Sequence, residues 1–580
     1  MVKQTFNKLS GTAVKLSSLC LRGFFCGLIK GEDFMNKIEN NLISSIKDVI
    51  KELYNVEDSS LVMIEIPKDN TNGDYSTNIA MRLAKVVRKA PVIIAKEMLE
   101  KLEETVEDYE KIEVAGPGFI NFFMKNTVLA DIINVVLDKK ETYGENNSGD
   151  NLPILIEYVS ANPTGDLHLG HARGAAWGDC ISRLLIKSGY DCLREYYIND
   201  AGAQMINLGK SVYARYAQYF GKEVEIPEDG YFGDDVKEIG KELAIEYGDV
   251  WLNQEEGRIE FFKEKGKEKE LDKIKRDLKY YRCEFDSWVS EQSLYDNGSV
   301  KKSIQKMIDM GLTFEEDGAL WFKSTKWGDD KDRVLVKSDG SLTYLAPDIA
   351  NHLNKFDRGY KKLVNLWGAD HHGYIARMKA AIQAMGYGEN DLEVDIIQMV
   401  RLVEDGVEVK MSKRTGNAIT IRELCDDVGV DSARYFFVSR AVDSHLDFDL
   451  GLARKKTNEN PVYYAQYAHA RICSILRQAP KFIKEENYDL LVSDKEIDIL
   501  KHIGEFTSVV ADAAYTRSPN KICNYVQKLA GYFHSFYGAY KIIDEDNREL
   551  TNQRLGLLLA TKQTLANALD LIGISAPEKM

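Results

Sequence analysis

Residues 154–187 read ILIEYVSANPTGDLHLGHARGAAWGDCISRLLIK, an apolar run followed by a turn and then by a helical pattern. Residues 154–159 have the composition of a buried parallel strand, and from residue 172 the apolar side chains recur at helical spacing. We therefore expect a strand that leads through a loop into a helix at the carboxyl edge of a sheet. The free N–H groups of such a helix start favour a bound anion, typically a phosphate.

The loop ends in His168-Leu169-Gly170-His171. Two imidazoles can donate hydrogen bonds to phosphoryl oxygens, and Gly170 lets a flat base or ribose lie against the backbone. In one alternative, His168 and His171 only begin the helix; in another, they bind zinc. No Cys or Glu follows at the spacing of metal ligands, so the sequence favours a nucleotide and no protein-bound metal.

A second motif, KMSKRTG, covers residues 410–416 and follows an expected hairpin that turns at Asp405-Gly406. Lys410 and Lys413, with Met411 and Ser412 between them, are suited to holding a triphosphate, although a lysine-rich loop is more often a solvated surface. HLGH followed far downstream by KMSK resembles the HIGH and KMSKS signatures of class I aminoacyl-tRNA synthetases. Chance co-occurrence of the two motifs in this order is a weak explanation.

The composition is that of a globular chain of three or four domains: 580 residues, 29% charged and 44% hydrophobic. The eight cysteines contain no CxxC pair, which favours a reducing compartment, and we expect a cytoplasmic protein. Residues 1–34 are an extension with five Lys or Arg and no acid before Glu32, and they contain no membrane span. They read as an upstream start ahead of Met35, or as an organelle-import peptide.

Residues 35–140 read as a small α/β domain, and a polar linker follows at 139–152. Phe119 beside Asn121 could stack on and hydrogen-bond an unpaired RNA base. The residues alone favour the other interpretation, in which this alternating aromatic run packs in the core.

A catalytic unit is expected over 150–452, with a charged, mostly helical insertion at about 203–332 between the halves of a nucleotide-binding fold. Its strand at 363–367 ends in Gly368-Ala369-Asp370-His371-His372. Asp370 can accept hydrogen bonds from ribose hydroxyls, and His371 and His372 can flank a base. Asp370 could equally cap the helix that follows.

Glu157 lies in an otherwise apolar strand, so its buried carboxylate requires a cationic partner. Asp348 makes the same demand in a similar setting. Two carboxylates and the Tyr344 hydroxyl around one pocket would suit a guanidinium, whose planar donors match carboxylates bidentately. The alternative is an internal Arg or Lys partner.

Several stretches together resemble arginyl-tRNA synthetases over nearly everything after residue 34: Glu157, Asn162, HLGH, SDGSLTYLAPDIA, WGADHHG, KMSKRTG and NPVYYAQYAHARICSIL. The resemblance implies a multidomain α/β fold with a Rossmann-like catalytic domain and its helical insertion, a small α/β N-terminal domain and an all-α anticodon-binding domain at 453–580. We expect a monomer, although the residues do not determine the oligomeric state.

The resemblance assigns the guanidinium of a bound arginine to Glu157, Tyr344 and Asp348, and the α-amino or carboxylate end to Asn162. ATP would contact His168, Gly170, His171, Gly368 and Asp370, with Lys410 and Lys413 on the pyrophosphate side and Mg²⁺ carried by the phosphates. Arg414 stands where the family signature has Ser, which puts only that position in doubt.

The implied reaction is attack of the arginine carboxylate on the α-phosphate of ATP, then transfer of the arginyl group to the terminal ribose of tRNA. Such a displacement needs positioning and charge stabilisation more than a protein nucleophile. A pocket of buried carboxylates would reject uncharged side chains, which leave the acids unpaired.

The last third is helical in pattern and starts after VDSARYF at 430–436, which resembles a DALR-type boundary. Residues 452–484 carry seven Lys or Arg against one acid, with tyrosines between them. Cations and rings are what RNA contact requires, and we name Tyr463, Tyr467 and Arg471 as candidates. Met580 matches the family's ending. A net charge of −15 disfavours non-specific RNA binding but suits a specific, oriented tRNA.

Three alternatives remain open from the residues. A different class I synthetase would share both signatures but lack the Glu157, Tyr344 and Asp348 set, and a cysteine-specific one would need a zinc cluster. A small nucleotidyltransferase would not need the helical C-terminal third. A non-catalytic RNA-binding relative would not need intact histidines and lysines.

Overall fold

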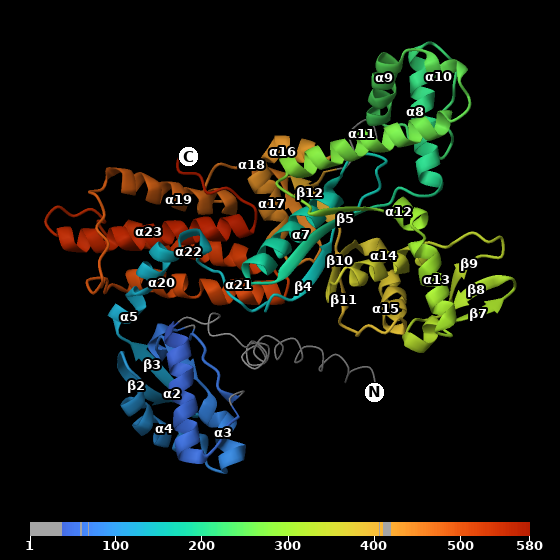
Figure 1. The fold of residues 1–580 in the computed structure, drawn as a ribbon. Helices are drawn as coiled ribbons and strands as arrows, with labels where there is room; N and C mark the ends of the chain where they lie inside the picture. The colour runs from blue at the N-terminus through green and yellow to red at the C-terminus, as the bar shows by residue number, and fades with distance from the viewer. Residues whose placement is uncertain (1–36, 59–60, 68, 405, 410–418) are drawn as a thin grey trace.

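The structure is a computed structural model that describes residues 37–58, 61–67, 69–404, 406–409 and 419–580. In Figure 1 a small N-terminal unit lies beside a long body. The body consists of a central parallel sheet, a projecting arm of helices, and C-terminal helices at the end opposite the arm. None of the helices in the described residues is long and apolar enough to cross a membrane.

The central sheet has five parallel strands in the order β11-β10-β4-β5-β6. Their bounds are β4 Pro153–Glu157, β5 Asp191–Ile198, β6 Ser287–Ser290, β10 Lys362–Gly368 and β11 Leu392–Ile397. The strand order reverses between β4 and β10, because the chain goes from β4 to β5 on one side and returns to β10 on the other. Ligands bind outside the carboxyl ends of the strands at such a switch point. The Rossmann-like fold expected from the sequence is confirmed.

Helix α7 (Leu169–Lys187) follows β4 and packs against it, as the opening stretch predicts. Gly178 allows this close approach, since a Cβ there would lie 2.3 Å from Cγ of Tyr158. Trp177 and Leu184 are buried on the same helix. The first strand, loop and helix therefore form one tightly packed unit.

The N-terminal unit combines helices with a three-stranded antiparallel sheet in the order β1-β3-β2. Its elements are α2 Lys37–Tyr54, β1 Tyr75–Thr77, α3 Ile79–Val87, α4 Pro91–Thr105, β2 Tyr109–Ala115 and β3 Phe119–Met124. Asn121 is buried, and its Oδ1 accepts a hydrogen bond of 2.7 Å from Oγ of Ser76. The structure therefore agrees with the packing of Asn121 inside the unit, which the residues alone favour, and the alternative contact of Asn121 with an RNA base has no support here. Phe119, at the start of β3, stays partly exposed.

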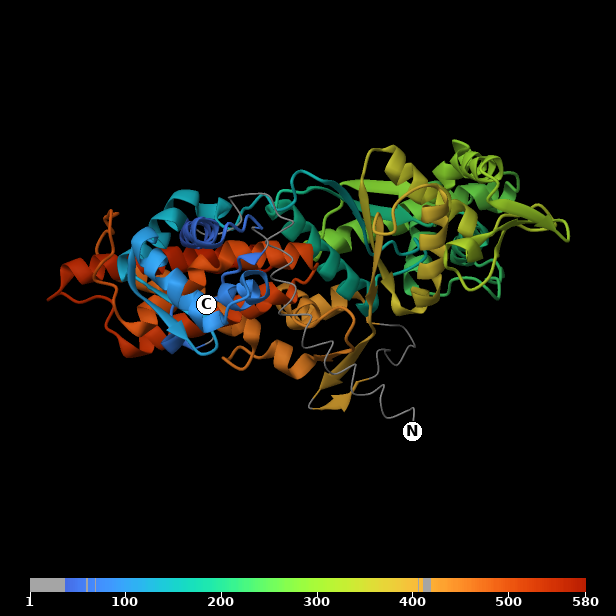
Figure 2. The same ribbon diagram turned by 90° about the horizontal axis from the view of Figure 1, so that it is seen from below.

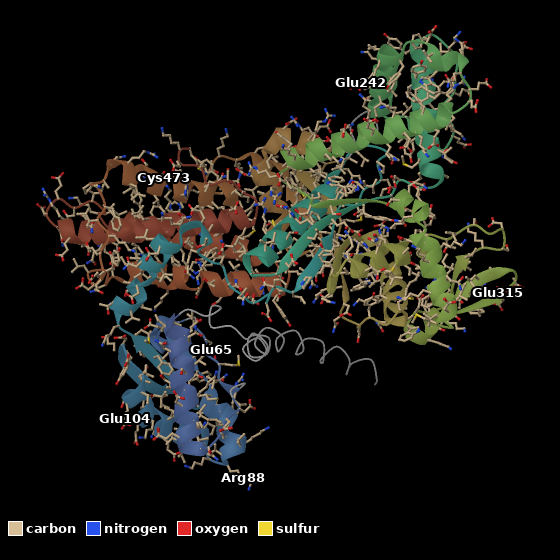
Figure 3. All side chains as sticks on the ribbon, in the orientation of Figure 1. Glu65, Arg88, Glu104, Glu242, Glu315 and Cys473 are labelled. Carbon is tan, nitrogen blue, oxygen red and sulfur yellow. The ribbon has the colours of Figure 1, made fainter. Side chains whose placement is uncertain are left out.

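The stretch expected to be an insertion forms two different structures. Helices α8 (Ala203–Tyr219), α9 (Asp234–Tyr247), α10 (Val250–Asn253) and α11 (Arg258–Tyr280) build the arm, at whose side Figure 3 labels Glu242. After the arm the chain returns to the central sheet as β6. This strand escaped sequence reasoning because SWVS is four residues long and lacks a buried alternation.

The remaining elements of the catalytic unit lie beyond β6. Helix α12 (Glu291–Asp296) and α13 (Ser299–Asp309) precede the antiparallel sheet of β7 (Thr313–Glu316), β8 (Ala319–Phe322) and β9 (Arg333–Val336), on which Figure 3 labels Glu315. Helix α14 (Leu345–Asp357) and α15 (Ile375–Ala384) then flank β10. A small sheet of β12 (Val400–Glu404), β13 (Val407–Glu408) and β14 (Leu446–Asp449) follows β11.

The C-terminal third is helical, as predicted. It contains α19 (Pro461–Gln478), α20 (Asp494–Gly504), α21 (Phe506–Tyr515), α22 (Asn520–Ala539) and α23 (Arg548–Leu571), preceded by α16 (Ile421–Val428), α17 (Val430–Val438) and α18 (Leu450–Arg454). Two short helices, α5 (Asn126–Ala130) and α6 (Ile132–Lys139), join the N-terminal unit to the body. The view in Figure 2 agrees that this unit lies against the C-terminal helices, and Lys501 of α20 pairs with Asp74.

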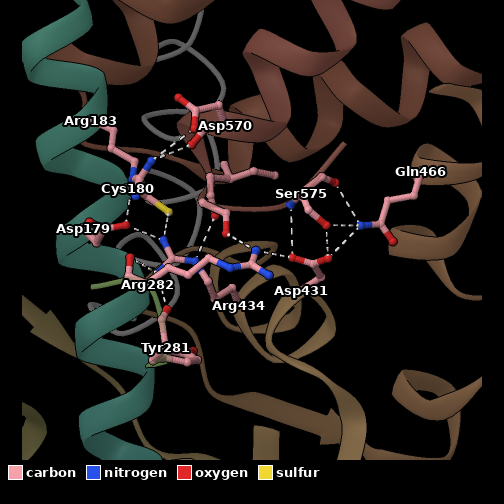
Figure 4. Close-up of polar contacts among 12 residues, drawn as sticks. Asp179, Cys180, Arg183, Tyr281, Arg282, Asp431, Arg434, Gln466, Asp570 and Ser575 are labelled. Atoms are coloured by element: carbon pink, nitrogen blue, oxygen red, sulfur yellow. Dashed lines mark hydrogen bonds and ion pairs between the residues drawn. The ribbon is translucent and has the colours of Figure 1, made fainter. Parts of the chain in front are cut away.

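A buried ion pair joins α7 to the C-terminal helices (Figure 4). Arg434 on α17 and Asp179 on α7 have fully buried side chains, and Nη2 of the arginine lies 2.5 Å from Oδ2 of the aspartate. The guanidinium also donates to the carbonyls of Tyr281 and Ile572, at 3.0 and 3.3 Å. At Gly573 (φ 67°) a Cβ would lie 2.2 Å from Nη2 of Arg434, so the chain after α23 closes over the pair.

A second set of contacts in Figure 4 holds the C-terminal tail. Asp431 pairs with Arg282 and accepts a hydrogen bond of 3.1 Å from the backbone N–H of Ser575. Nε2 of Gln466 donates to the same carboxylate at 2.8 Å. Together with Arg434, these contacts bring α7, the end of α11, α17, α19 and the tail to one point.

Asp179→Asn tests the importance of this junction. The variant leaves the Arg434 charge buried without a counter-charge, and losing one partner of a buried pair costs about 3–5 kcal/mol. We expect the urea midpoint of unfolding to fall accordingly.

The matched control is Asp447→Asn, which removes the exposed ion pair between Asp447 and Arg401. An exposed pair contributes about 1 kcal/mol or less, so this variant should unfold near the wild-type midpoint. Equal midpoints for the two variants would contradict the role given to the buried pair.

Candidate active site

A cleft of about 710 Å³ opens at the carboxyl ends of β4 and β10. Its walls come from the loop and helix start at 159–174, from residues 366–371 at the end of β10 and in the 3-10 helix η5 (Ala369–Tyr374), and from residues 397–400. A larger cavity of about 840 Å³ between the N-terminal unit and α20 contains none of the predicted site residues. The switch point of the sheet, and not the larger cavity, is therefore where the predicted chemistry gathers.

The backbone is strained where the chain leaves β4. Val159 and Ser160 have φ values of 69° and 40°, a region that non-glycine residues rarely adopt, least of all a β-branched one. Ser160 is held there by its side chain: Oγ donates to Oε1 of Glu157 at 3.3 Å and accepts from the N–H of Tyr197 at 3.1 Å. Strain held in place at a strand end is typical of a functional site.

His168 and His171 stack at the N-terminus of α7 with ring centroids 3.8 Å apart. Nδ1 of His168 accepts from the N–H of Gly170 at 3.2 Å, and Nδ1 of His171 accepts from the N–H of His168 at 3.2 Å. Both rings therefore carry their proton on Nε2. Burial lowers both pKa values, and with the neighbouring His168 it brings that of His171 to about 3. The two neutral rings offer N–H donors beside a helix N-terminus, where anions bind.

Lys410, Met411, Ser412 and Lys413 lie outside the described residues, but both ends of their segment are fixed. On one side, the N–H of Val409 donates to the carbonyl of Leu402 in the hairpin at 2.9 Å. On the other, Thr420 forms a β-bridge with His168, and the N–H of Ile421 donates to the carbonyl of Leu167 at 2.8 Å. Thr420, on the C-terminal side of this segment, thus lies directly beside the first histidine.

The end of β10 supplies the opposite wall. At Gly368 a Cβ would lie 2.5 Å from Oδ1 of Asp370, so a side chain there would have to displace this exposed carboxylate. The Asp370 carboxylate is exposed and pairs with Nδ1 of His371 at 3.1 Å. His371 lines the cleft, whereas His372 is exposed in the same 3-10 helix, η5 (Ala369–Tyr374). Asp370 lies inside η5 and does not cap α15.

Glu157 has the internal partner that the sequence left open. Its carboxylate pairs with Nζ of Lys355 on α14, a fully buried lysine that also lies 3.5 Å from Oε1 of Glu195. The charge of Glu157 is therefore already balanced within the protein, and its expected contact with the guanidinium, together with Tyr344 and Asp348, stays a prediction. The sequence does contain a sign of this partner, because Lys355 is a single lysine in the apolar pattern of α14.

Asp348 and Glu291 form no ion pair within the described residues. The hydroxyl of Tyr374 donates to Oδ2 of Asp348 at 2.5 Å. Burial raises the pKa of Asp348 to about 6, although part of the residue's surface stays open. Burial, Asp348 and Asp200 raise the pKa of Glu291 to about 7. The two carboxyls therefore interact with each other without an ion pair in this part of the chain, and Lys355 and His371 offset the raised pKa of Asp348 only in part.

Sequence reasoning missed Glu291, because the acid directly follows the unrecognised strand β6. The Tyr197 and Tyr295 phenols lie beside its carboxyl, and both have pKa values raised chiefly by burial. Tyr344 also interacts with Tyr295 electrostatically, but it is 75% exposed. Asn162 lines the cleft, and its Nδ2 donates to Oε1 of Gln204 at 2.8 Å.

The residues expected to contact RNA gather on and around α19. The rings of Tyr463 and Tyr467 stack at 6.1 Å, and Tyr467 also stacks on His534. Arg471 lies over the Tyr537 ring at 4.7 Å. The C-terminal tail runs along the same helix, since Nδ1 of His469 lies 2.9 Å from the carbonyl of Pro577, and Met580 is 55% exposed.

The residues that the structure describes contain no cluster of metal ligands. No group of three or more His, Cys, Asp or Glu side chains is arranged there to hold an ion. Asp166 and Asp370 are the carboxylates that line the cleft, and Asp166 is paired with Lys273 on α11.

Family models match the chain in three consecutive parts. Residues 40–124 match the arginyl-tRNA synthetase N-terminal domain, 132–446 match the catalytic domain of class I (R) tRNA synthetases, and 465–580 match the DALR anticodon-binding domain.

Individual proteins agree. The arginine--tRNA ligase of Bacillus subtilis is 54% identical over 555 residues, which cover 93% of this chain and the whole relative. Arginine--tRNA ligase 1 of Halalkalibacterium halodurans is 55% identical over 90% of this chain and 94% of its own. The Thermus thermophilus arginyl-tRNA synthetase shares the fold, with a TM-score of 0.72 over 94% of this chain and all of its own, at 22% identity.

The state of the two histidines can be measured with ¹⁵N-labelled histidine by NMR. We expect the Nε2–H form for both rings at pH 7. His171 should show no titration above about pH 5, because its pKa is lowered to about 3. His445, whose ring is exposed, provides the comparison in the same spectra. Protonation of His171 near pH 6.5, or a proton on its Nδ1, would contradict the geometry.

Proposed function

The chain belongs to the arginyl-tRNA synthetase family, and we propose how its residues divide the work of the reaction. It is an ATP-dependent arginine--tRNA ligase: it activates arginine to arginyl-adenylate with release of pyrophosphate, then transfers the arginyl group to the 3′-terminal ribose of its tRNA. The observation that carries the proposal is the pair of Asp348 and Glu291, two interacting carboxyls with raised pKa values and no ion pair within the described residues.

ATP occupies the cleft between β4 and β10. The Nε2–H groups of His168 and His171 donate to phosphate oxygens, and the N-terminus of α7 adds its partial positive charge. These donors are preorganised where negative charge builds up during attack on the α-phosphate. Gly170 and Gly368 leave room for the nucleotide, and Asp370 accepts from the ribose hydroxyls. His371 and His372 flank the base.

Lys410 and Lys413, with Met411 and Ser412, act on the pyrophosphate side. The support is the position of their segment's ends, which leave the hairpin at Val409 and return beside His168 at Thr420. Mg²⁺ enters with ATP, held mainly by the phosphates, and neutralises part of their charge. Of the two carboxylates in the lining, Asp166 is paired with Lys273, and Asp370 is the one that contacts the ion.

Arginine binds with its guanidinium between Asp348 and Glu291. Both carboxyls ionise when the cation arrives, because an opposite charge offsets the burial that raises their pKa values. Tyr344 closes the open side, and Asn162 meets the α-amino or carboxylate end. Glu157, balanced by Lys355, fixes the floor of the pocket through Ser160.

Selectivity follows from the same charges. An uncharged side chain would leave two buried carboxyls without a partner, which a hydrogen-bonding site penalises heavily. Lysine brings a charge, but its ammonium cannot serve two planar carboxylates as a guanidinium does.

The tRNA contacts the helical C-terminal domain through Tyr463, Tyr467, Arg471 and Met580, and the N-terminal unit through Phe119. Stacked rings next to a guanidinium suit unpaired bases and phosphates. We further propose that the protein acts as a monomer in the cytoplasm, as its bacterial-type relatives and scattered cysteines favour.

Glu291→Gln and Asp348→Asn test the pocket. Each should raise the KM for arginine by about ten- to a hundredfold, the loss typical of a charged hydrogen-bond acceptor, and leave the KM for ATP nearly unchanged. In the wild type, kcat/KM for arginine should fall as pH decreases from about 7 to about 6, because protonation of the raised carboxyls removes the charge that binds guanidinium.

Glu291→Gln should lose the part of this pH dependence nearest pH 7. Glu315→Gln, on the exposed strand β7, is the control and should match the wild type. An unchanged KM for arginine in both pocket variants would reject the assignment.

A further inference from the structure

The position of Glu291 depends on a very short helix. Helix α12 has six residues, and Glu291 is the first of them. Its start is capped by Ser290, whose Oγ accepts from the N–H of Ser293 at 3.2 Å. A helix of this length has little stability of its own, so contacts from outside must hold it.

The main outside contact is Asp200, a buried carboxylate that follows β5. Its Oδ1 accepts from the backbone N–H of Gln292 at 3.0 Å, and the hydroxyl of Ser290 lies 2.9 and 2.8 Å from its two oxygens. Asp200 thus grips the residues on both sides of Glu291. From the other side, Nζ of Lys267 on α11 lies 3.5 Å from Oδ2 and joins the arm to the same point.

We propose that Asp200 is a positioning and specificity-determining residue for arginine, which aims the Glu291 carboxyl into the guanidinium pocket and adds negative charge behind it. The inference rests on the proposed role of Glu291. Asp200 itself touches no substrate in this account; it acts through the start of α12.

The charges around Glu291 give Asp200 a second effect. Two acids face Glu291: Asp348 on α14 and Asp200 after β5. The Tyr197 and Tyr295 phenols lie beside its carboxyl. The nearby cation is Lys267, which pairs with Asp200 and not with Glu291 itself. Both acids raise the pKa of Glu291, after burial as the main cause. Loss of the Asp200 charge should therefore let Glu291 ionise at a lower pH.

Asp200→Ala removes the grip on α12. At saturating ATP and tRNA, the KM for arginine should rise by about tenfold, as expected for a lost buried acceptor, with the KM for ATP changed less than about twofold. In the double variant with Glu291→Gln, the KM for arginine should be no higher than in Glu291→Gln alone, because Asp200 acts through that residue. Independent, multiplying effects would overturn the proposal, and so would an equal rise in both KM values.

Asp200→Asn removes the negative charge of Asp200 but keeps an oxygen that can accept its hydrogen bonds, so it separates the two effects. It also keeps the proposal testable if Asp200→Ala does not fold. The amide oxygen can still accept from Gln292 and Ser290, so the KM for arginine should rise less than in Asp200→Ala. The acid limb of kcat/KM for arginine should move down by roughly half a pH unit or more, because one of the two acids that raise the pKa of Glu291 is gone. If the acid limb of kcat/KM stays at the wild-type pH in Asp200→Asn, the proposed effect of the Asp200 charge on Glu291 is contradicted.

Asp74→Ala is the matched structural control. Asp74 also accepts from a backbone N–H, that of Met124 at 2.6 Å, and pairs with a lysine, Lys501, but far from the pocket. The KM of the Asp74→Ala variant for arginine should equal that of the wild type. If Glu291→Gln itself has no effect, the proposed pocket fails; if Glu291→Gln is impaired while Asp200→Ala is not, the pocket stands and the role of Asp200 fails.

Discussion

The buried pair of Arg434 and Asp179 is the contact on which the arrangement of the molecule depends. Both side chains are fully buried. The other N–H groups of the guanidinium donate to carbonyls at the ends of α11 and α23. Since Asp179 lies on α7, the helix that presents His168 and His171 is fixed to the C-terminal helices. The cleft is therefore joined to the C-terminal helices by packed structure.

The substrate pocket uses buried charge in the opposite way. Glu157 and Glu195 are balanced by Lys355 and Arg358, which makes the floor rigid before any ligand binds. Asp348 and Glu291 hold raised pKa values because burial outweighs the charges around them, and neither forms an ion pair within the described residues. In the proposed binding mode, the arginine side chain supplies the cation for these two carboxyls.

Local sequence determined much of this. The strand, loop and helix of 154–187 could be predicted because each side chain's role there is set by neighbours within a few positions. The partners of buried charges could not, because they depend on packing: Lys355 meets Glu157 across 198 positions. Glu291 was missed since β6 is a short edge strand without alternation, and Asn121 faces inward by the register of β3 with β1.

Calorimetric titration with arginine, repeated in buffers of different ionisation enthalpy, tests the central claim most directly. At a pH between about 6 and about 7, binding should release protons, because the guanidinium lowers the pKa values of Asp348 and Glu291. Citrulline, the uncharged analogue of arginine, should bind far more weakly and release none. Arginine binding without proton release, or citrulline binding of similar affinity, would contradict a pocket completed by the substrate's charge.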